Sequence, residues 1–229
     1  HFDDILDGIV FAGVIALGFA TVENVLYYGR EIAETGFSGM FLFLFIVRGV
    51  MSPFAHVTFT AMTGIGSGIS RESHNMVVRI MMPVLGYGCA VLLHAIWNGM
   101  AVVGGLGGFV LGYIFLQVPF FAIFVGFAFY VMYRQNKILK EMLAIDAARG
   151  LIPQEHLHIA TSAFRSTGWL VNGLFSGNFR ARNNYLRALG KLGLSYWHIQ
   201  RATAAQGQTA SFQQNPILRE EVMRWRSQV

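Results

Sequence analysis

The chain has 229 residues, of which 54% are hydrophobic, and it carries 20 Phe, 26 Gly and a net charge of +5. Several apolar runs are longer than a helix of a soluble core needs, so the composition argues against a soluble domain and predicts a multi-span membrane protein. The single cysteine, Cys89, lies within an apolar run, which excludes a disulfide framework.

Charge divides the chain into two expected domains. Residues 1–133 hold four Lys/Arg and seven Asp/Glu, a net charge of −3, whereas residues 134–229 hold thirteen and five, a net charge of +8. We expect a transmembrane helical domain followed by a basic, amphipathic helical tail. A basic surface after the last span favours a position near anionic lipid. Nucleic acid is not an expected partner, because no recognition motif accompanies the charge.

The first expected span covers about residues 8–28, which is long enough to cross a hydrocarbon core of about 30 Å at about 1.5 Å per residue. Glu23 and Asn24 lie near its far end. An ionisable carboxyl at that depth must face a protein interior or a water-filled cavity, because lipid offers it no partner.

The second apolar stretch, residues 37–69, is too long for one untilted crossing. Gly49 and Pro53 offer a place to break, so we expect a short apolar lead-in and then a span over about residues 53–69. Polar or small residues recur every four positions and form a strip with His56 in its middle: Arg48, Ser52, His56, Thr60 and Gly64.

The third expected span, within residues 80–103, contains the run LLHAIWNG. His94 and Asn98 lie four residues apart in this run, and therefore on one face of a helix. Burying an imidazole and an amide in a membrane is costly, so such a pair usually marks a site.

The fourth expected span covers about residues 109–133, and its one strong polar group, Gln117, suggests support for the bundle and not a site. The expected fold class is therefore all-α: a polytopic membrane helix bundle of about four spans with a C-terminal helical tail.

In the tail, helices are expected over about residues 135–149 and 183–205, and glycines are expected to interrupt residues 168–177. Asn215 before Pro216 predicts the start of a last helix.

Successive spans alternate in direction, which brings Glu23, His56 and His94 into the same leaflet. Basic residues gather at the opposite face and where the fourth span leaves the membrane: Arg71, Arg79, Arg134, Lys137 and Lys140. The positive-inside rule therefore predicts a multi-pass protein of the cell membrane whose tail is cytoplasmic. The polar cluster then opens toward the outer side.

Three runs, each in an apolar span, resemble the motifs of one family: GFATVEN at residues 18–24, HVTFTAMTG at 56–64 and HAIWN at 94–98. In this order they are similar to the PrsW family of intramembrane proteases, which is distantly similar to CAAX-prenyl endopeptidases. The resemblance covers about residues 3–133. The family pattern also has an E-E-x-x-K motif on a preceding helix, the family's presumed water-activating pair, and residues 1–22 do not contain it.

The resemblance implies an intramembrane endopeptidase that hydrolyses a peptide bond of a membrane-anchored protein near the outer leaflet. A membrane-bound anti-sigma factor is the substrate class that it implies, and the lipid bilayer is the second expected partner.

The candidate catalytic set has five members: Glu23, Asn24, His56, His94 and Asn98. The imidazole of His94 would activate water or polarise the scissile carbonyl, while the amide of Asn98 would hold the oxyanion. Glu23 would act as a general base or a ligand. A purely structural interpretation exists for the same groups: an interhelical hydrogen bond, a bond along the helix of His56, or an ion pair between Glu23 and Arg48.

A metal site is the alternative mechanism. Glu23, His56 and His94 offer two imidazoles and one carboxylate, a set that leaves a position on zinc open for water. The helix-borne H-E-x-x-H motif is absent, so the sequence favours a glutamic-type mechanism over a metal-dependent one.

A non-catalytic function is also open: a membrane scaffold, or a proton-coupled carrier that uses the same polar cluster as a relay. A carrier is expected to show inverted repeats and paired broken helices, whereas one break, near Pro53, is visible.

Overall fold

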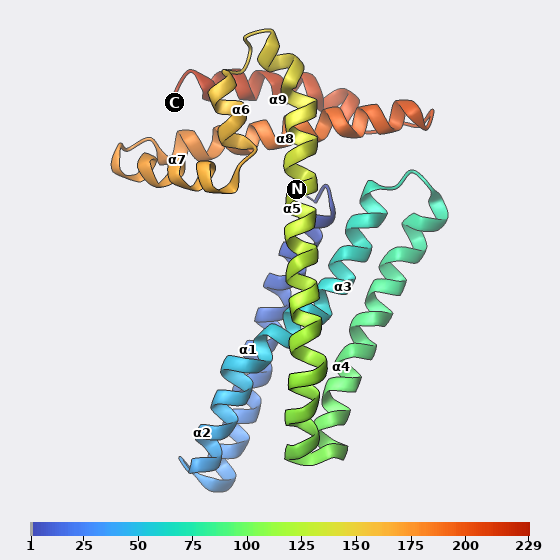
Figure 1. Cartoon of the computed structure of the whole chain (residues 1–229), viewed down its shortest axis with the longest axis vertical. Helices are drawn as coiled ribbons and strands as arrows, with labels where there is room; N and C mark the ends of the chain where they lie inside the picture. Colours follow the sequence, from blue (N-terminus) through green and yellow to red (C-terminus); the bar gives the residue numbers. More distant parts are fainter. Residues whose placement is uncertain (1) are drawn as a thin grey trace. The chain divides into compact units, whose positions relative to one another are not determined.

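A computed structural model describes residues 2–229, apart from the side chains of residues 101 and 106. The described residues form helices and no strand, which confirms the all-α fold class (Figure 1). The chain divides into two compact units, which meet in sequence between Val131 and Met132.

The first unit is built from long apolar helices. Its elements are α1 (Ile5–Thr35), α2 (Gly39–Ile46), a π-helical turn (Val47–Met51), α3 (Ser52–Glu72), α4 (Met76–Gly112), a second π-helical turn (Tyr113–Gln117) and the first part of α5 (Val118–Ala148). Four segments of the described chain are long and apolar enough to cross a membrane: Ile5–Thr35, Gly39–Glu72, Met76–Gly105 and Gly107–Ala148. The last two are divided by a kink within α4 at Gly105, where φ is 56°. The expected number of spans is therefore confirmed.

Glycines bring the backbones of neighbouring spans together. A Cβ atom on Gly64 of α3 would collide with the carbonyl of Gly8 in α1, and one on Gly66 would collide with the carbonyl of Met82 in α4. Helices in lipid associate through such close approaches, because apolar burial alone gives them no advantage there. Helix α3 thus packs against both α1 and α4, which run beside it in Figure 1.

The expected break in the second apolar stretch is present. The π-helical turn contains Gly49, and α3 begins directly after it with Pro53 in its first turn. Proline suits this position because the first N–H groups of a helix have no partner within the helix. The short α2 forms the expected lead-in.

Two expectations about helix boundaries are wrong. Helix α5 does not end near residue 133 but continues to Ala148, because no glycine or proline follows Gly126 until Gly150, where φ is 75°. A separate helix over residues 135–149 therefore does not exist.

In the tail, the expected interruption by glycines occurs only at the end of the expected range, and the last proline departs from expectation. Helix α7 (Ala163–Phe175) runs through Gly168 and Gly173 and ends before Gly177, where φ is 76°. Helix α9 (Ser211–Arg226) begins one turn before Pro216, and Asn215 is not its cap. Instead the Asn215 amide donates a hydrogen bond to Ser195 Oγ at 2.7 Å.

The second unit has a core of large side chains. Helices α6 (Gln154–Ala160), α7, α8 (Phe179–Ala204) and α9 share one core with the end of α5. Its most deeply buried members are Leu143, Ile152, Tyr185, Leu189, Leu192 and Val222. Burial of this apolar surface stabilises the second unit.

Candidate active site

Three helices of the first unit each bring one ionisable side chain to the same depth. Glu23 lies 18 residues after the start of α1, His56 lies 16 residues before the end of α3, and His94 lies 18 residues after the start of α4. At about 1.5 Å per residue these positions are about 24–27 Å from the face where those helix ends meet. The alternation of spans therefore places them in one layer.

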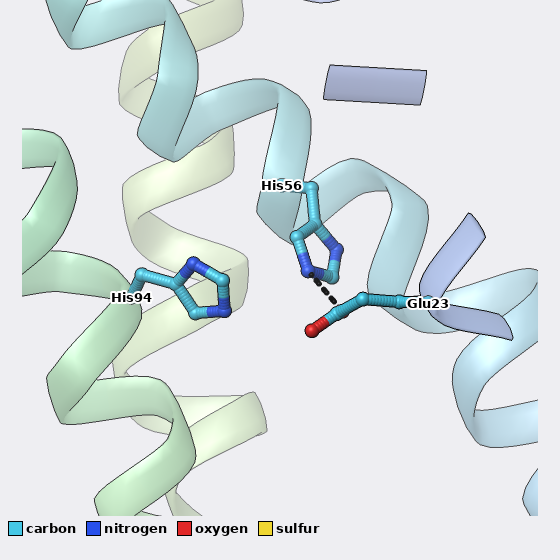
Figure 2. A group of neighbouring side chains, drawn as sticks. All are labelled: Glu23, His56 and His94. Atoms are coloured by element: carbon cyan, nitrogen blue, oxygen red, sulfur yellow. Dashed lines mark ion pairs between the residues drawn. The ribbon is translucent and has the colours of Figure 1, made fainter. Parts of the chain in front are cut away.

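The three side chains point toward one another (Figure 2). Each offers a ligand atom, and these atoms all lie within 4.8 Å of one another. His56 Nε2 is 3.1 Å from Glu23 Oε2, and the ring of His94 approaches that of His56 edge-on with a centroid distance of 5.1 Å. The residues that the sequence places in one leaflet thus form one cluster in the structure.

A backbone contact sets the tautomer of His56. Its Nδ1 atom is 3.0 Å from the carbonyl oxygen of Ser52, one turn earlier in α3. Because a carbonyl oxygen only accepts, Nδ1 must carry the hydrogen, and Nε2 of the neutral ring then presents a lone pair.

That lone pair faces a carboxylate. The His56 side chain is only 5% exposed, and its Nε2 atom makes no hydrogen bond among the described residues although Glu23 Oε2 is near. Two lone pairs at this distance repel each other unless a proton or a cation lies between them. The 3.1 Å contact is therefore an ion pair only when His56 is protonated. When His56 is neutral, its Nε2 atom and Glu23 Oε2 are placed as two ligands of a cation.

Arg48 holds Glu23 from the other side. Its guanidinium donates to Glu23 Oε2 at 3.0 Å and stacks over the ring of Tyr27, 3.5 Å from the centroid. The Asn24 amide donates to the carbonyl oxygen of Arg48 at 3.1 Å. Glu23 and Asn24 of α1 therefore both bond to Arg48 of the π-helical turn. Turns of π-helix are often found at functional sites.

A cavity of about 360 Å³ adjoins the two histidines. It extends from His56 and His94 toward positions about two turns away, and its lining is mostly apolar with hydroxyl groups at Thr60, Thr63 and Tyr87. Phe19 closes the histidine end, where its ring lies 5.6 Å from that of His56 and 5.9 Å from that of His94. The space suits an apolar side chain with a few polar groups to orient it.

The remaining candidate residues have different positions. Asn98 lies one turn beyond His94, where its side chain is exposed and does not line the cavity. Asn24 bonds to a backbone carbonyl and is not directed at the cluster. Their proposed catalytic roles stay predictions.

Two contributors to the site were missed in the sequence. Tyr27 lies one turn after Glu23, a spacing that could have suggested a partner for Arg48. The carbonyl of Ser52 is a backbone group, so no side-chain pattern could have indicated its role.

The first unit is similar to a known protein family. Residues 1–126, more than half of the chain, match the family described as PrsW family intramembrane metalloprotease. Protease PrsW of Oceanobacillus iheyensis is 29% identical over 142 residues, which cover 60% of this chain and 56% of that protein. Protease PrsW of Clostridioides difficile is 32% identical over 96 residues, 38% of each chain.

No solved structure matches the chain. The chain spans little more than half the length of one curated relative and less of the other. Its four apolar helices and the match make it a multi-pass membrane protein. With the matched region containing Glu23, His56 and His94, the chain belongs to the PrsW family of intramembrane metalloproteases.

Proposed function

We propose that this protein is an intramembrane endopeptidase that hydrolyses a peptide bond of a membrane-anchored protein. The observation that carries the proposal is the convergence of Glu23, His56 and His94 within 4.8 Å from three separate spans. Ionisable groups are expensive at this depth, and their presence there usually marks chemistry or transport. The curated relatives, which are named as proteases, support chemistry and not transport.

The residues fit a divalent metal ion such as zinc. Two imidazole nitrogens and one carboxylate oxygen match the ligands that catalytic zinc uses, with a fourth position left for water. The buried Nε2 lone pair of His56, fixed by the Ser52 carbonyl, is the arrangement expected of a metal-binding histidine. When bound, zinc would make a water molecule acidic and polarise the scissile carbonyl.

The lone pair of His56 favours the metal-dependent mechanism over the glutamic-type mechanism that the sequence favoured. The glutamic-type mechanism would need a proton on His56 to join its Nε2 atom to Glu23, whereas a metal ion bound by both residues needs none. The family description, which names a metalloprotease, points the same way.

The surrounding residues have roles that need no metal to describe. Arg48 orients Glu23, because its guanidinium donates directly to the carboxylate. The cavity beside the histidines would receive an apolar side chain next to the scissile bond, and the hydroxyls of Thr60 and Thr63 could bond to unwound substrate backbone. Asn98 would supply an oxyanion donor only to a substrate lying on the exposed side of α4.

The finer features of the sequence interpretation belong to this proposal. Cleavage would occur near the outer leaflet, the tail would be cytoplasmic by the positive-inside rule, and an anti-sigma factor is one candidate substrate. A scaffold or a proton-coupled carrier would use the same cluster without cleaving anything.

Comparison of protein fragments in the native host tests the proposal. New chain termini within or beside membrane segments of other proteins should appear with the wild type and with His74→Ala, which changes an exposed loop histidine. With His94→Ala they should fall to the level of cells that lack the protein, because the proposed metal would lose one of its three ligands. Unchanged fragments with a stably folded His94→Ala protein would exclude a catalytic role and favour the scaffold.

A further inference from the structure

Helix α7 of the tail exposes an apolar stripe. Phe164 is 94% exposed and Phe175 is 89% exposed, and Val171 and Leu174 are exposed as well. Phe164, Val171 and Phe175 are spaced by seven and four residues, so they lie on one line along the helix.

The opposite face of α7 is the one that packs. Gly173 lies against Phe179, and Trp169 contacts Tyr185 and receives the guanidinium of Arg182 over its ring. The orientation of α7 is therefore fixed by the core of the second unit. Its phenylalanines face outward although an inward face was available.

Basic side chains border this stripe. Arg165, next to Phe164, lines a cleft of about 770 Å³ together with Lys137 and Lys140 of α5. Among the described residues that line the cleft, Glu141 is the one carboxylate. The cleft is suited to an anion with a tetrahedral group such as a phosphate.

We propose that α7 is an interfacial helix that docks on the surface of an anionic phospholipid bilayer. Phe164, Val171 and Phe175 enter the boundary between headgroups and acyl chains, to a depth of about 5–10 Å. Lys137, Lys140 and Arg165 hold a phospholipid phosphate beside them.

The position of the cleft along α5 supports a bilayer as the occupant. The segment Gly107–Ala148 has 42 residues, about twice the number needed to cross the hydrocarbon core. A helix entering at Gly107 reaches the opposite headgroups about 25 residues later, where the exposed rings of Tyr130 and Tyr133 match an interfacial aromatic belt. Lys137 and Lys140 follow at once, at the level of the phosphates.

Tethering and charge favour lipid over a protein partner. The tail is covalently joined to membrane spans, so a bilayer surface is always present at high effective concentration. The tail's net charge of +8 is attracted to anionic headgroups. Amphipathic helices bind a bilayer surface both by burying apolar side chains and by electrostatic attraction to anionic lipids.

Depth-dependent quenching of a fluorophore tests the proposal without any activity measurement. The whole protein, with Cys89→Ser, would carry an environment-sensitive probe on Phe175→Cys and be placed in nanodiscs of phosphatidylcholine with or without phosphatidylglycerol. Acyl chains brominated near the headgroup serve as quenchers. The matched control is Asn172→Cys, an exposed position on the polar flank of the same helix.

We expect strong quenching at position 175 in anionic nanodiscs, weak quenching at position 172, and less quenching at 175 without phosphatidylglycerol. Replacing Lys137, Lys140 and Arg165 by glutamine should shift the docking equilibrium by about fivefold for each cation removed. The same loss of charge at Arg180, Arg187 and Lys191 of α8 should change it less, since these residues do not line the cleft.

Three results would overturn the proposal. They are equal quenching at positions 172 and 175, quenching at 175 that ignores phosphatidylglycerol, and a probe at 175 that is shielded in detergent because two copies associate.

Discussion

The most deeply buried residues of the two units differ in size. In the membrane unit they are mainly small, among them Ala16, Ala20, Ala55 and Ala61, and many of its large apolar side chains are exposed. The tail buries leucine, isoleucine, valine and tyrosine around α8 and exposes its charges. We attribute the difference to the solvent. Moving a leucine side chain out of water is favourable, whereas moving it out of lipid gains almost nothing, because lipid tails are equally apolar.

Buried polar groups consequently have different meanings in the two units. In the tail, Asp146 accepts a hydrogen bond from Tyr196 at 2.9 Å and pairs with Arg219, which ties α5 to α8 and α9. In the membrane unit, Glu23 and His56 face each other across a gap that suits a cation. Each network leaves a buried nitrogen without a hydrogen bond within the described part of the chain, Arg219 Nε in the tail and His56 Nε2 in the membrane unit, and each adjoins a cavity. The second differs because its nitrogen directs a lone pair at a carboxylate oxygen, whereas a guanidinium nitrogen is a donor.

The largest expected effect of a single substitution on stability lies in the tail core. Leu189→Ala, at a fully buried position, should lower the free energy of unfolding of the tail by about 2–5 kcal/mol. Leu85→Ala, on a 56% exposed position of α4, is the matched control and should have little effect. Thermal unfolding in nanodiscs, followed by tryptophan fluorescence, measures the stability of both variants. Equal losses of stability would contradict the difference between the two units.

In the membrane unit the sensitive positions should be glycines. Gly64→Val would force α3 away from Gly8 of α1 and should destabilise the unit by at least about 1–3 kcal/mol. Gly88→Val places its side chain in open space and is the control. Denaturation in mixed detergent should show the difference, and indistinguishable midpoints would mean that the helices do not meet as described.

Arg219 and Arg48, which each pair with a carboxylate, should respond differently to substitution. Arg219→Gln leaves the carboxylate of Asp146, which is 2% exposed, without its charged partner and should cost the tail about 1–3 kcal/mol. Arg48→Gln should instead reduce cleavage, because Glu23 loses its orientation, with little change in unfolding temperature. A destabilised and fully active Arg48→Gln protein would reverse the assignment.

The smallest expected effect is a dependence of tail stability on pH. Burial lowers the pKa of His156, whose Nδ1 is 3.1 Å from Tyr185 Oη. The unfolded chain then binds more protons near the ordinary histidine pKa, so this contribution is present above that pKa and is lost as the pH falls. His156→Gln should flatten the profile of unfolding temperature between about pH 7.5 and 5.5, the range in which histidine titrates. His158→Gln, at an exposed position, should not.

Much of the membrane unit could be predicted because span length and alternation are simple constraints. They were enough to place Glu23, His56 and His94 in one layer, and the structure brings them together. The contacts that orient His56 and Glu23 could not be predicted from the sequence. The Ser52 carbonyl belongs to the backbone, and the position of Arg48 over Tyr27 depends on the π-helical turn at Val47–Met51.

The tail was harder to predict because glycine and proline rules depend on context. Gly173 lies within α7, where a side chain would collide with α8. Pro216 lies within α9. Helix α5 also passes from the apolar to the polar part of the chain without a break, since a change of solvent does not end a helix. Local patterns cannot report these tertiary effects.

Zinc stoichiometry tests the central claim most directly, because it needs no substrate. The purified protein, loaded with zinc and passed through a desalting column, should retain about one ion per chain, and so should His74→Ala. Glu23→Gln, His56→Ala and His94→Ala should each lose most of it at unchanged unfolding temperature. A wild-type protein that retains no zinc, or three variants that retain it fully, would contradict the assignment of Glu23, His56 and His94 as one metal-binding catalytic centre.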